Sequence, residues 1–98
     1  MSVLRLNEFT ARPGQLENLA VKMRGFCNAI REIPGCQCCE VLLKMADGET
    51  ADDQVIVLEV WDSIEAHKSA ASAIDPGDIA TVMALLAGPP KGQYYQAV

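Results

Sequence analysis

The hydrophobic and polar positions of this chain change their period several times, and each change marks the end of a predicted element. Residues 3–10 hold four apolar side chains interrupted by Arg5, Asn7 and Glu8, and they predict a first strand, which ends at a turn around Pro13. In residues 15–32 the apolar side chains recur at steps of three and four, which predicts an amphipathic helix. The stripe consists of Leu16, Leu19, Ala20, Met23, Phe26, Cys27 and Ile30. Gly25 lies in the same helix, and its cost of about 1 kcal/mol relative to alanine indicates a close contact there.

The middle of the chain predicts a hairpin. Residues 36–45 predict a second strand, and residues 46–53 are acidic and predict an exposed loop with Asp47-Gly48 as its turn. Residues 55–61 are almost continuously apolar, so both faces of this third strand are expected to be covered.

Two short helices and a last strand follow. Either Asp62 or Ser63 can cap the first helix, which is expected to end near Ser72. Asp75 is the predicted N-cap of the second helix, and a proline follows it at the first helical turn. Residues 93–98 predict the last strand, which begins with a glutamine and two tyrosines.

The predicted order is β-α-β-β-α-α-β, which is the ferredoxin-like pattern with its second helix divided in two. We therefore expect a single α+β domain spanning residues 1–98, with an antiparallel sheet covered by helices on one face. The other face would expose the alternate apolar residues of the segment 55–61. Because large exposed apolar patches are unusual in monomers and two-fold dimers are the commonest oligomers, we expect a homodimer packed sheet to sheet.

Composition excludes several partners. The chain has 13 acidic and 8 basic residues and a net charge of −5. An acidic domain without a basic cluster is a poor ligand for nucleic acid or an anionic membrane, so neither is expected as a partner. No apolar run approaches the ~20 residues that span a bilayer, and the first residues become polar too early for a signal peptide, which favours a cytoplasmic location. Four isolated arginines are expected to be solvated, and these are Arg5, Arg12, Arg24 and Arg31.

The four cysteines are Cys27, Cys36, Cys38 and Cys39. Cys38 and Cys39 are adjacent and Cys36 and Cys38 are two apart, and neither of these two spacings is the C-x-x-C of redox motifs and zinc knuckles. Regular alternation places Cys36 and Cys38 on one face of a strand and Cys39 on the other. We expect small buried hydrophobic residues and predict no metal site. The alternatives are a metal site shared with His67 and a thiol-based redox role.

Five residues are candidates for a functional site. His67 is the only imidazole, and its pKa near neutrality suits proton transfer, although a hydrogen bond within the fold is the alternative. Asn7 lies in an apolar strand, where its amide either holds a substrate oxygen or bonds the neighbouring strand. Trp61 either lines a pocket for aromatic molecules or anchors the core. Tyr94 and Tyr95 point to opposite faces of a regular strand, and the sequence does not choose between them.

Three blocks of sequence carry a further signal. They are Phe-Thr-Ala-Arg-Pro-Gly-Gln at 9–15, Pro-Gly-Cys at 34–36 and Glu-Val-Trp-Asp-Ser-Ile-Glu-Ala-His at 59–67. In this order they resemble the antibiotic biosynthesis monooxygenase family, in which the third block is a strand-to-helix junction. The resemblance implies a dimeric α/β barrel, with a pocket in each subunit between its sheet and its helices.

The match to this family is uneven. Asn7 matches a first-strand asparagine that some members use in the pocket, and Trp61 and His67 match a junction tryptophan and a histidine common in the short helix. Many members have another histidine one turn later, where this chain has Ala70. Haem-degrading members supply an axial histidine from the region that matches residues 74–83, and this sequence has none there. Haem degradation is therefore not expected.

The resemblance implies a cofactor-independent monooxygenase acting on a small aromatic such as a hydroquinone or a polyketide-like phenol. In that chemistry the substrate supplies the electrons, while the protein removes a phenolic proton, orients the ring and stabilises negative charge. His67 would be the base and Asn7 would orient oxygen. Trp61, Tyr94 and Tyr95 would supply the substrate-binding wall. The alternatives are a non-catalytic small-molecule-binding or stress-associated dimer, and an isomerase or lyase that uses the same pocket.

Overall fold

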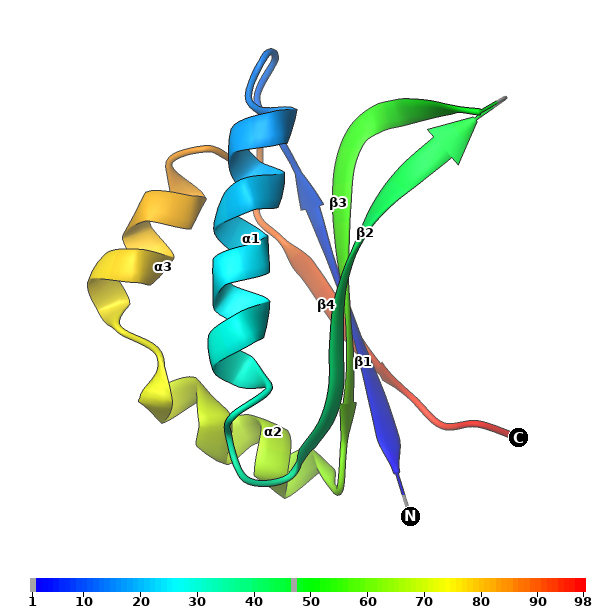
Figure 1. Cartoon of the computed structure of the whole chain (residues 1–98), viewed down its shortest axis with the longest axis vertical. Helices are drawn as coiled ribbons and strands as arrows, with labels where there is room; N and C mark the ends of the chain where they lie inside the picture. The colour runs from blue at the N-terminus through cyan, green and yellow to red at the C-terminus, as the bar shows by residue number, and fades with distance from the viewer. Residues whose placement is uncertain (1, 47) are drawn as a thin grey trace.

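The computed structural model describes residues 2–46 and 48–98, which form one four-stranded antiparallel sheet with helices on one face (Figure 1). The strands are β1 (Val3–Thr10), β2 (Cys36–Ala46), β3 (Glu49–Trp61) and β4 (Lys91–Tyr95), in the order β2-β3-β1-β4. The helices are α1 (Leu16–Ile30), α2 (Ile64–Ala70) and α3 (Pro76–Met83), and a 3₁₀ helix, η1 (Ala71–Ala73), follows α2. The predicted α+β class and ferredoxin-like order are confirmed.

The hairpin of β2 and β3 is longer than predicted. Pairing continues to Met45↔Thr50 and Ala46↔Glu49, so most of the expected loop is strand. Ladder hydrogen bonds between the two strands outweigh the low strand propensity of these small and acidic residues. Gly48 has a φ of +83°, a conformation that suits a glycine in a turn, while Asp47 of the predicted turn lies outside the described residues.

The last strand lies earlier than predicted. β4 spans Lys91–Tyr95 rather than residues 93–98, because its register with β1 runs from Leu4↔Tyr95 to Glu8↔Lys91. Its pairing with β1, which the local sequence does not reveal, therefore decides where this edge strand lies.

Side-chain caps fix the starts of the short helices. Ser63 caps α2, since its hydroxyl accepts a hydrogen bond from a first-turn backbone N–H at 3.1 Å. Asp62, the other candidate, accepts instead from Gln37 Nε2 at 2.7 Å. Asp75 caps α3 as predicted. The Ser63 cap matters for the site, because it fixes the first turn of the helix that carries His67.

Two glycines differ in what surrounds them. An added Cβ at Gly25 would meet no atom within 4 Å, so the expected close contact in α1 is wrong; the position is exposed. The close approach is at Gly35, which has a φ of +93° and whose Cβ would lie 2.9 Å from Ala66 Cβ. Glycine is therefore required where the turn before β2 passes α2.

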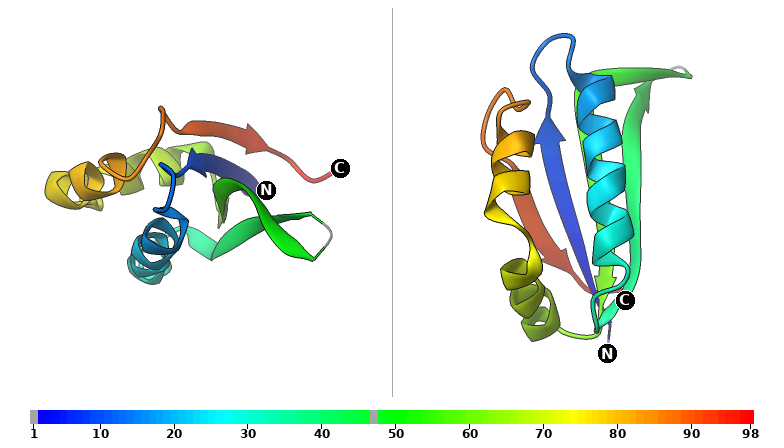
Figure 2. Two further views of the ribbon diagram at one scale, coloured as in Figure 1. Left: turned by 90° about the horizontal axis from the view of Figure 1, so that it is seen from above. Right: turned by 60° about the vertical axis from the view of Figure 1, so that its left-hand side comes forward.

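The core lies between α1 and the inner face of the sheet, on which Figure 2 shows all of the helices. Its most buried large side chains are Trp61, Leu19, Val55, Val57, Cys27 and Cys39. Residues that stand opposite each other in an antiparallel pair share a face. The odd-numbered residues of β1 and β3 consequently point toward the helices, and the even-numbered residues point away from them.

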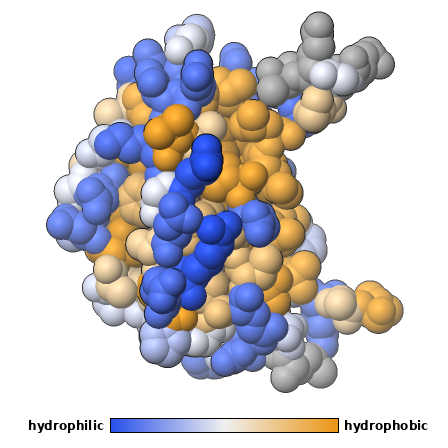
Figure 3. All heavy atoms as spheres, viewed as in Figure 1, coloured by the Kyte–Doolittle hydropathy of each residue, from blue (hydrophilic) through white to orange (hydrophobic). Residues whose placement is uncertain are grey.

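The outer face of the sheet is apolar and uncovered in the single chain. Its partly buried residues are Leu4, Leu6, Ile56, Leu58 and Val60. Leu42 and Tyr95 flank them on β2 and β4 and are 45% and 47% exposed. Figure 3 shows apolar side chains gathered over β2 and β3, beside the charged outer surface of α1. Within this chain, the expectation that both faces of β3 are covered holds for the inner face alone.

Candidate active site

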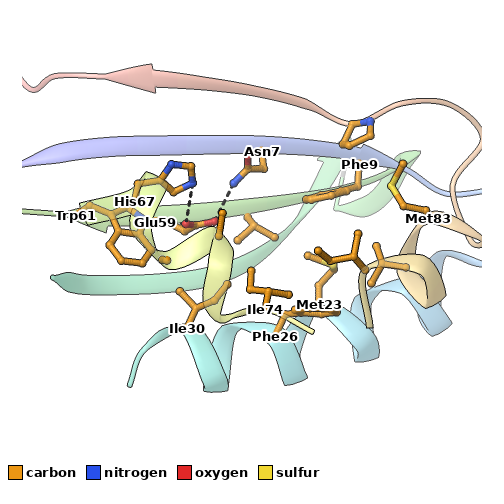
Figure 4. Close-up of a pocket in the computed structure, with 16 residues that line it drawn as sticks. Asn7, Phe9, Met23, Phe26, Ile30, Glu59, Trp61, His67, Ile74 and Met83 are labelled. Carbon is orange, nitrogen blue, oxygen red and sulfur yellow. Dashed lines mark hydrogen bonds and ion pairs between the residues drawn. The ribbon is translucent and has the colours of Figure 1, made fainter. Parts of the chain in front are cut away.

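A cavity of about 240 Å³ lies between the inner face of the sheet and the helices (Figure 4). Most of its wall is apolar, and the larger apolar side chains are Phe9, Met23, Phe26, Ile30, Ile74 and Met83. Polar side chains gather at the end nearer Trp61, where Asn7, Glu59 and His67 point toward one another. The structure thus brings three of the five predicted site residues to one cavity: Asn7, Trp61 and His67.

The register of β1 and β3 sets this polar end. Asn7 stands opposite Val57, and Glu59 stands opposite Arg5, so Asn7 and Glu59 are diagonal neighbours on the inner face. Asn7 Nδ2 donates a hydrogen bond to Glu59 Oε2 at 2.8 Å across 52 residues of sequence. Trp61 follows Glu59 on the same face, and its Nε1 donates to Glu59 Oε1 at 2.8 Å.

Glu59 is the site residue that the sequence analysis missed. It is 5% exposed, and no other charged residue in the described part of the chain is buried. Burial raises its pKa, and the hydrogen bonds from Trp61 and Asn7 and the charge of Arg5 oppose that rise only in part. The signal was present, since Glu59 is the single charged residue in the otherwise apolar segment 55–61.

His67 extends from α2 toward the same end. Its Nδ1 lies 2.6 Å from the Tyr94 hydroxyl, and its Nε2 lies 3.9 Å from Glu59 Oε1. The imidazole is held edge-on between the rings of Trp61 and Tyr94, at centroid distances of 5.6 and 5.3 Å. Burial lowers the pKa of His67, and the charges of Arg5 and Lys68 lower it further. The imidazole is therefore neutral at pH 7 and able to accept a proton.

Tyr94 and Tyr95 point to opposite faces of the sheet, as strand alternation predicts. Tyr94 stands opposite Arg5 on the inner face and contacts the site through His67. Tyr95 stands opposite Leu4 on the outer face, where its hydroxyl donates to Gln93 Oε1 at 2.8 Å. Tyr94 is thus a neighbour of the cavity, and Tyr95 lies on the far side of the sheet.

Arg5 is held within the fold, so its predicted solvation is wrong. Its Nε donates to Asn7 Oδ1 at 3.0 Å, and its guanidinium lies 4.6 Å from the centre of the Tyr94 ring. Space for it exists because Gly92 has no side chain, since an added Cβ there would collide with the guanidinium. Both ends of the Asn7 amide are consequently engaged, one with Glu59 and the other with Arg5.

Two further arginines, Arg12 and Arg31, are exposed as predicted, but each also donates to a backbone carbonyl. Arg12 Nε donates to the Leu86 carbonyl at 3.0 Å, and Arg31 Nε donates to the Cys39 carbonyl at 2.8 Å. Arg12 thereby joins the turn after β1 to the segment after α3, and Arg31 joins the end of α1 to β2.

A bulge in β2 rearranges the cysteines. Cys36 stands opposite Trp61 and Cys38 opposite Val60, so the two lie on different faces, and the prediction that they share one is wrong. Cys39, opposite Glu59, faces the core with Cys36. Among residues 2–46 and 48–98, no three His, Cys, Asp or Glu side chains are grouped to hold a metal ion.

This arrangement is suited to moving a proton in an apolar surrounding. A neutral imidazole and a carboxyl group with a raised pKa face the same end of a cavity whose walls are otherwise apolar. Trp61 is 1% exposed in the core and also lines the cavity.

Comparisons with known proteins place these features in a wider group. The sequence model described as antibiotic biosynthesis monooxygenase matches residues 2–86. No curated protein matches the sequence. No helix in the described part of the chain is long and apolar enough to cross a membrane.

Several solved structures share the fold. Rv0793 from Mycobacterium tuberculosis is 20% identical, with a TM-score of 0.80 over 100% of this chain and 96% of the other. A conserved protein from Methanosarcina mazei is 10% identical, with a TM-score of 0.83 over 98% and 92% of the two chains. A variant of SnoaB, a cofactor-independent oxygenase from Streptomyces nogalater, is 19% identical, with a TM-score of 0.77 over 98% and 92%. At these identities the likeness concerns the fold.

Proposed function

Because this chain belongs to the antibiotic biosynthesis monooxygenase family, we propose that it is a cofactor-independent monooxygenase acting on a small aromatic, such as a hydroquinone or a polyketide-like phenol. The observation that carries the proposal is the placement of neutral His67 beside Asn7 and Glu59 at the one polar end of an apolar cavity. A fold shared with a cofactor-independent oxygenase is consistent with it.

The cavity favours a small, flat and largely apolar substrate. Its volume of about 240 Å³ lies below the ~300–1,000 Å³ typical of pockets for drug-sized ligands, which favours one or two rings. Phe9, Phe26 and Met83 offer aromatic and thioether contacts to such a ring. A hydroxyl group of the substrate would then lie at the polar end, near His67.

In the proposed reaction His67 is the base. This role requires the tautomer in which Nδ1–H donates to the Tyr94 hydroxyl, because the Nε2 lone pair is then left to take the phenolic proton. The resulting imidazolium is stabilised by the Glu59 carboxylate 3.9 Å away. Removing the proton makes the ring electron-rich enough to transfer electrons to dioxygen in a site that excludes water.

The substrate supplies every electron in this scheme. For a hydroquinone, one atom of dioxygen enters the ring, the other leaves as water, and the product is a hydroxyquinone. The Asn7 amide has one N–H beyond the one donated to Glu59, and that group orients the reacting oxygen. Trp61 and Tyr94 hold the imidazole, and Trp61 also forms part of the cavity wall.

The proposal includes a homodimer that packs through the outer face of the sheet. The partly buried Leu4, Leu6, Ile56, Leu58 and Val60 have no covering layer within the described chain. A second sheet would remove this apolar surface from water, which is a favourable change of about 25 cal/mol per Å².

Oxygen consumption with a panel of hydroquinones and phenols tests the activity. The wild type is expected to consume oxygen with at least one member, and His67→Ala to lose ~100-fold or more in kcat. Ser69→Ala changes an exposed, uncharged side chain of α2 and is the matched control. Equal rates for the wild type and His67→Ala would show that His67 is not the base.

A proton-moving isomerase or lyase is the second candidate, and one specific feature favours it. Glu59 and His67 are two proton carriers 3.9 Å apart, which is what a reaction that removes and returns a proton requires. Turnover of an aromatic or enolisable compound under anaerobic conditions would favour this candidate. Turnover that needs dioxygen would exclude it.

A further inference from the structure

Two thiols that the proposed function does not use meet in the core between α1 and β2. Cys39 Sγ donates a hydrogen bond to Cys27 Sγ at 2.7 Å, and the two residues are 0% and 1% exposed. The sulfurs of a disulfide lie about 2.05 Å apart, so a bond between these two needs a further approach of less than ~1 Å. We infer that Cys27 and Cys39 are a redox modification site, a dithiol that hydrogen peroxide oxidises to an intramolecular disulfide.

The surroundings assign different roles to the two sulfurs. The hydrogen bond from Cys39 and the charge of Arg31 lower the pKa of Cys27, although burial opposes them. The same hydrogen bond, together with burial, raises the pKa of Cys39. Cys27 is therefore the nucleophile, and Cys39 is the resolving thiol that attacks in the second step.

Contacts around the pair keep it aligned. Arg31, at the C-terminal end of α1, donates from Nε to the Cys39 carbonyl at 2.8 Å and so ties the helix to β2 next to the sulfurs. The remaining cysteines, Cys36 and Cys38, make no side-chain hydrogen bond to this pair within the described part of the chain. Cys36 Sγ donates to the Cys38 carbonyl at 3.5 Å, and Cys38 lies on the outer face of the sheet.

The cavity wall includes neighbours of the pair, although neither sulfur lines the cavity. Phe26 and Ile30, which line the cavity, flank Cys27 along α1, and Glu59, which also lines it, stands opposite Cys39 in the sheet. Because both thiols are buried, peroxide in the cavity reaches the sulfurs only when these wall side chains move.

The chemistry balances with peroxide as the oxidant. The Cys27 thiolate attacks one peroxide oxygen, the O–O bond breaks, and the displaced hydroxide takes a proton to become water, which leaves a sulfenic acid. Cys39 sulfur then attacks Cys27 sulfur, and the S–O bond breaks as the S–S bond forms. The hydroxyl group leaves with the Cys39 proton as a second water. The two sulfurs lose two electrons in total, and the peroxide gains them.

Mass spectrometry of the purified full chain tests the inference. The reduced protein is treated with hydrogen peroxide, quenched with catalase, unfolded and alkylated with iodoacetamide. Four alkylated thiols are expected before treatment, and two afterwards, on Cys36 and Cys38, with tandem mass spectra that show a Cys27–Cys39 link. The oxidised protein should also melt about 5 °C or more above the reduced one, since the cross-link restricts the unfolded chain.

Variants separate this pairing from its competitors. Cys36→Ser/Cys38→Ser retains only the proposed pair and should still form the disulfide. Cys39→Ser removes the resolving thiol, so Cys27 should accumulate as a sulfenic acid that dimedone labels. A link that involves Cys36 or Cys38, a disulfide between two chains, or four thiols still alkylated after peroxide would each overturn the inference. The measurement on the wild type tests the inference even if a variant does not fold. It also does not depend on the proposed monooxygenase activity.

Discussion

The Glu59 carboxylate of β3 and the His67 imidazole of α2 face each other across the polar end of the cavity, with Oε1 3.9 Å from Nε2. This distance is too long for a direct hydrogen bond, so the two groups interact through their charges when His67 is protonated. Burial raises the pKa of Glu59 and lowers the pKa of His67, which brings the two values closer together. Both shifts favour the uncharged form of the group at this end of the cavity.

These two shifts predict opposite pH dependences of folding stability. Glu59 binds its proton more tightly in the folded chain, so its contribution is greatest below pH 4.5 and falls as the pH rises toward its folded-state pKa. His67 binds its proton less tightly when folded, so stability is lost as the pH falls below 6.5. Each slope is limited to about 1.4 kcal/mol per pH unit for one proton.

Urea unfolding at a series of pH values measures both effects. Glu59→Gln should remove the decline of stability above pH 4.5, and His67→Gln should remove the loss below pH 6.5. Profiles of both variants that run parallel to the wild type would contradict the assignment of these shifts.

The two tyrosines are expected to differ in their effect on turnover. Tyr94→Phe keeps the ring but removes the hydroxyl that holds His67 Nδ1, so kcat should fall about tenfold and its pH profile should shift. Tyr95→Phe removes a hydroxyl on the outer face and should leave kcat unchanged. Steady-state oxygen consumption with the fastest substrate of the panel measures both. Equal losses in the two variants would argue against a role for Tyr94 through His67.

The outer face of the sheet predicts the oligomeric state. The wild type should be a dimer at micromolar concentration, and Ile56→Glu should halve the mass by placing a charge in the apolar face. Val21→Glu is the control, because Val21 is 62% exposed on α1 and lies away from that face. Light scattering coupled to size-exclusion chromatography measures the mass. A monomeric wild type would overturn the homodimer and leave the cavity chemistry untouched.

A pair of glycine substitutions tests the packing of α2, the helix that positions His67. Gly35→Ala should destabilise the fold by about 1–3 kcal/mol, because it forces a positive φ on alanine and brings Cβ against Ala66. Gly25→Ala should stabilise the fold by about 0.5–1 kcal/mol, since the position is in an exposed part of α1 with free space around it. Chemical denaturation measures both. Effects of equal sign would contradict the environments described for these two residues.

Local patterns predicted most of the elements correctly. The three- and four-residue period of α1, the caps at Ser63 and Asp75 and the apolar run of β3 each act over a few residues, so they are readable in sequence. The errors in the limits and faces of strands occurred where pairing with a neighbouring strand sets them. β4 takes its limits from pairing with β1, and the bulge after Cys36 reverses the face that alternation assigned to Cys38.

The sequence by itself determined the order of elements, the α+β class and the presence of His67, Asn7 and Trp61 as chemically suitable side chains. Only the tertiary structure decided that Glu59 belongs with them, that Tyr94 rather than Tyr95 meets His67, and that Cys27 meets Cys39. The physical reason is that hydrophobic periodicity is a local property of the chain. The contacts of Asn7 with Glu59 and of His67 with Tyr94 join residues 52 and 27 positions apart, and strand register and helix packing set them.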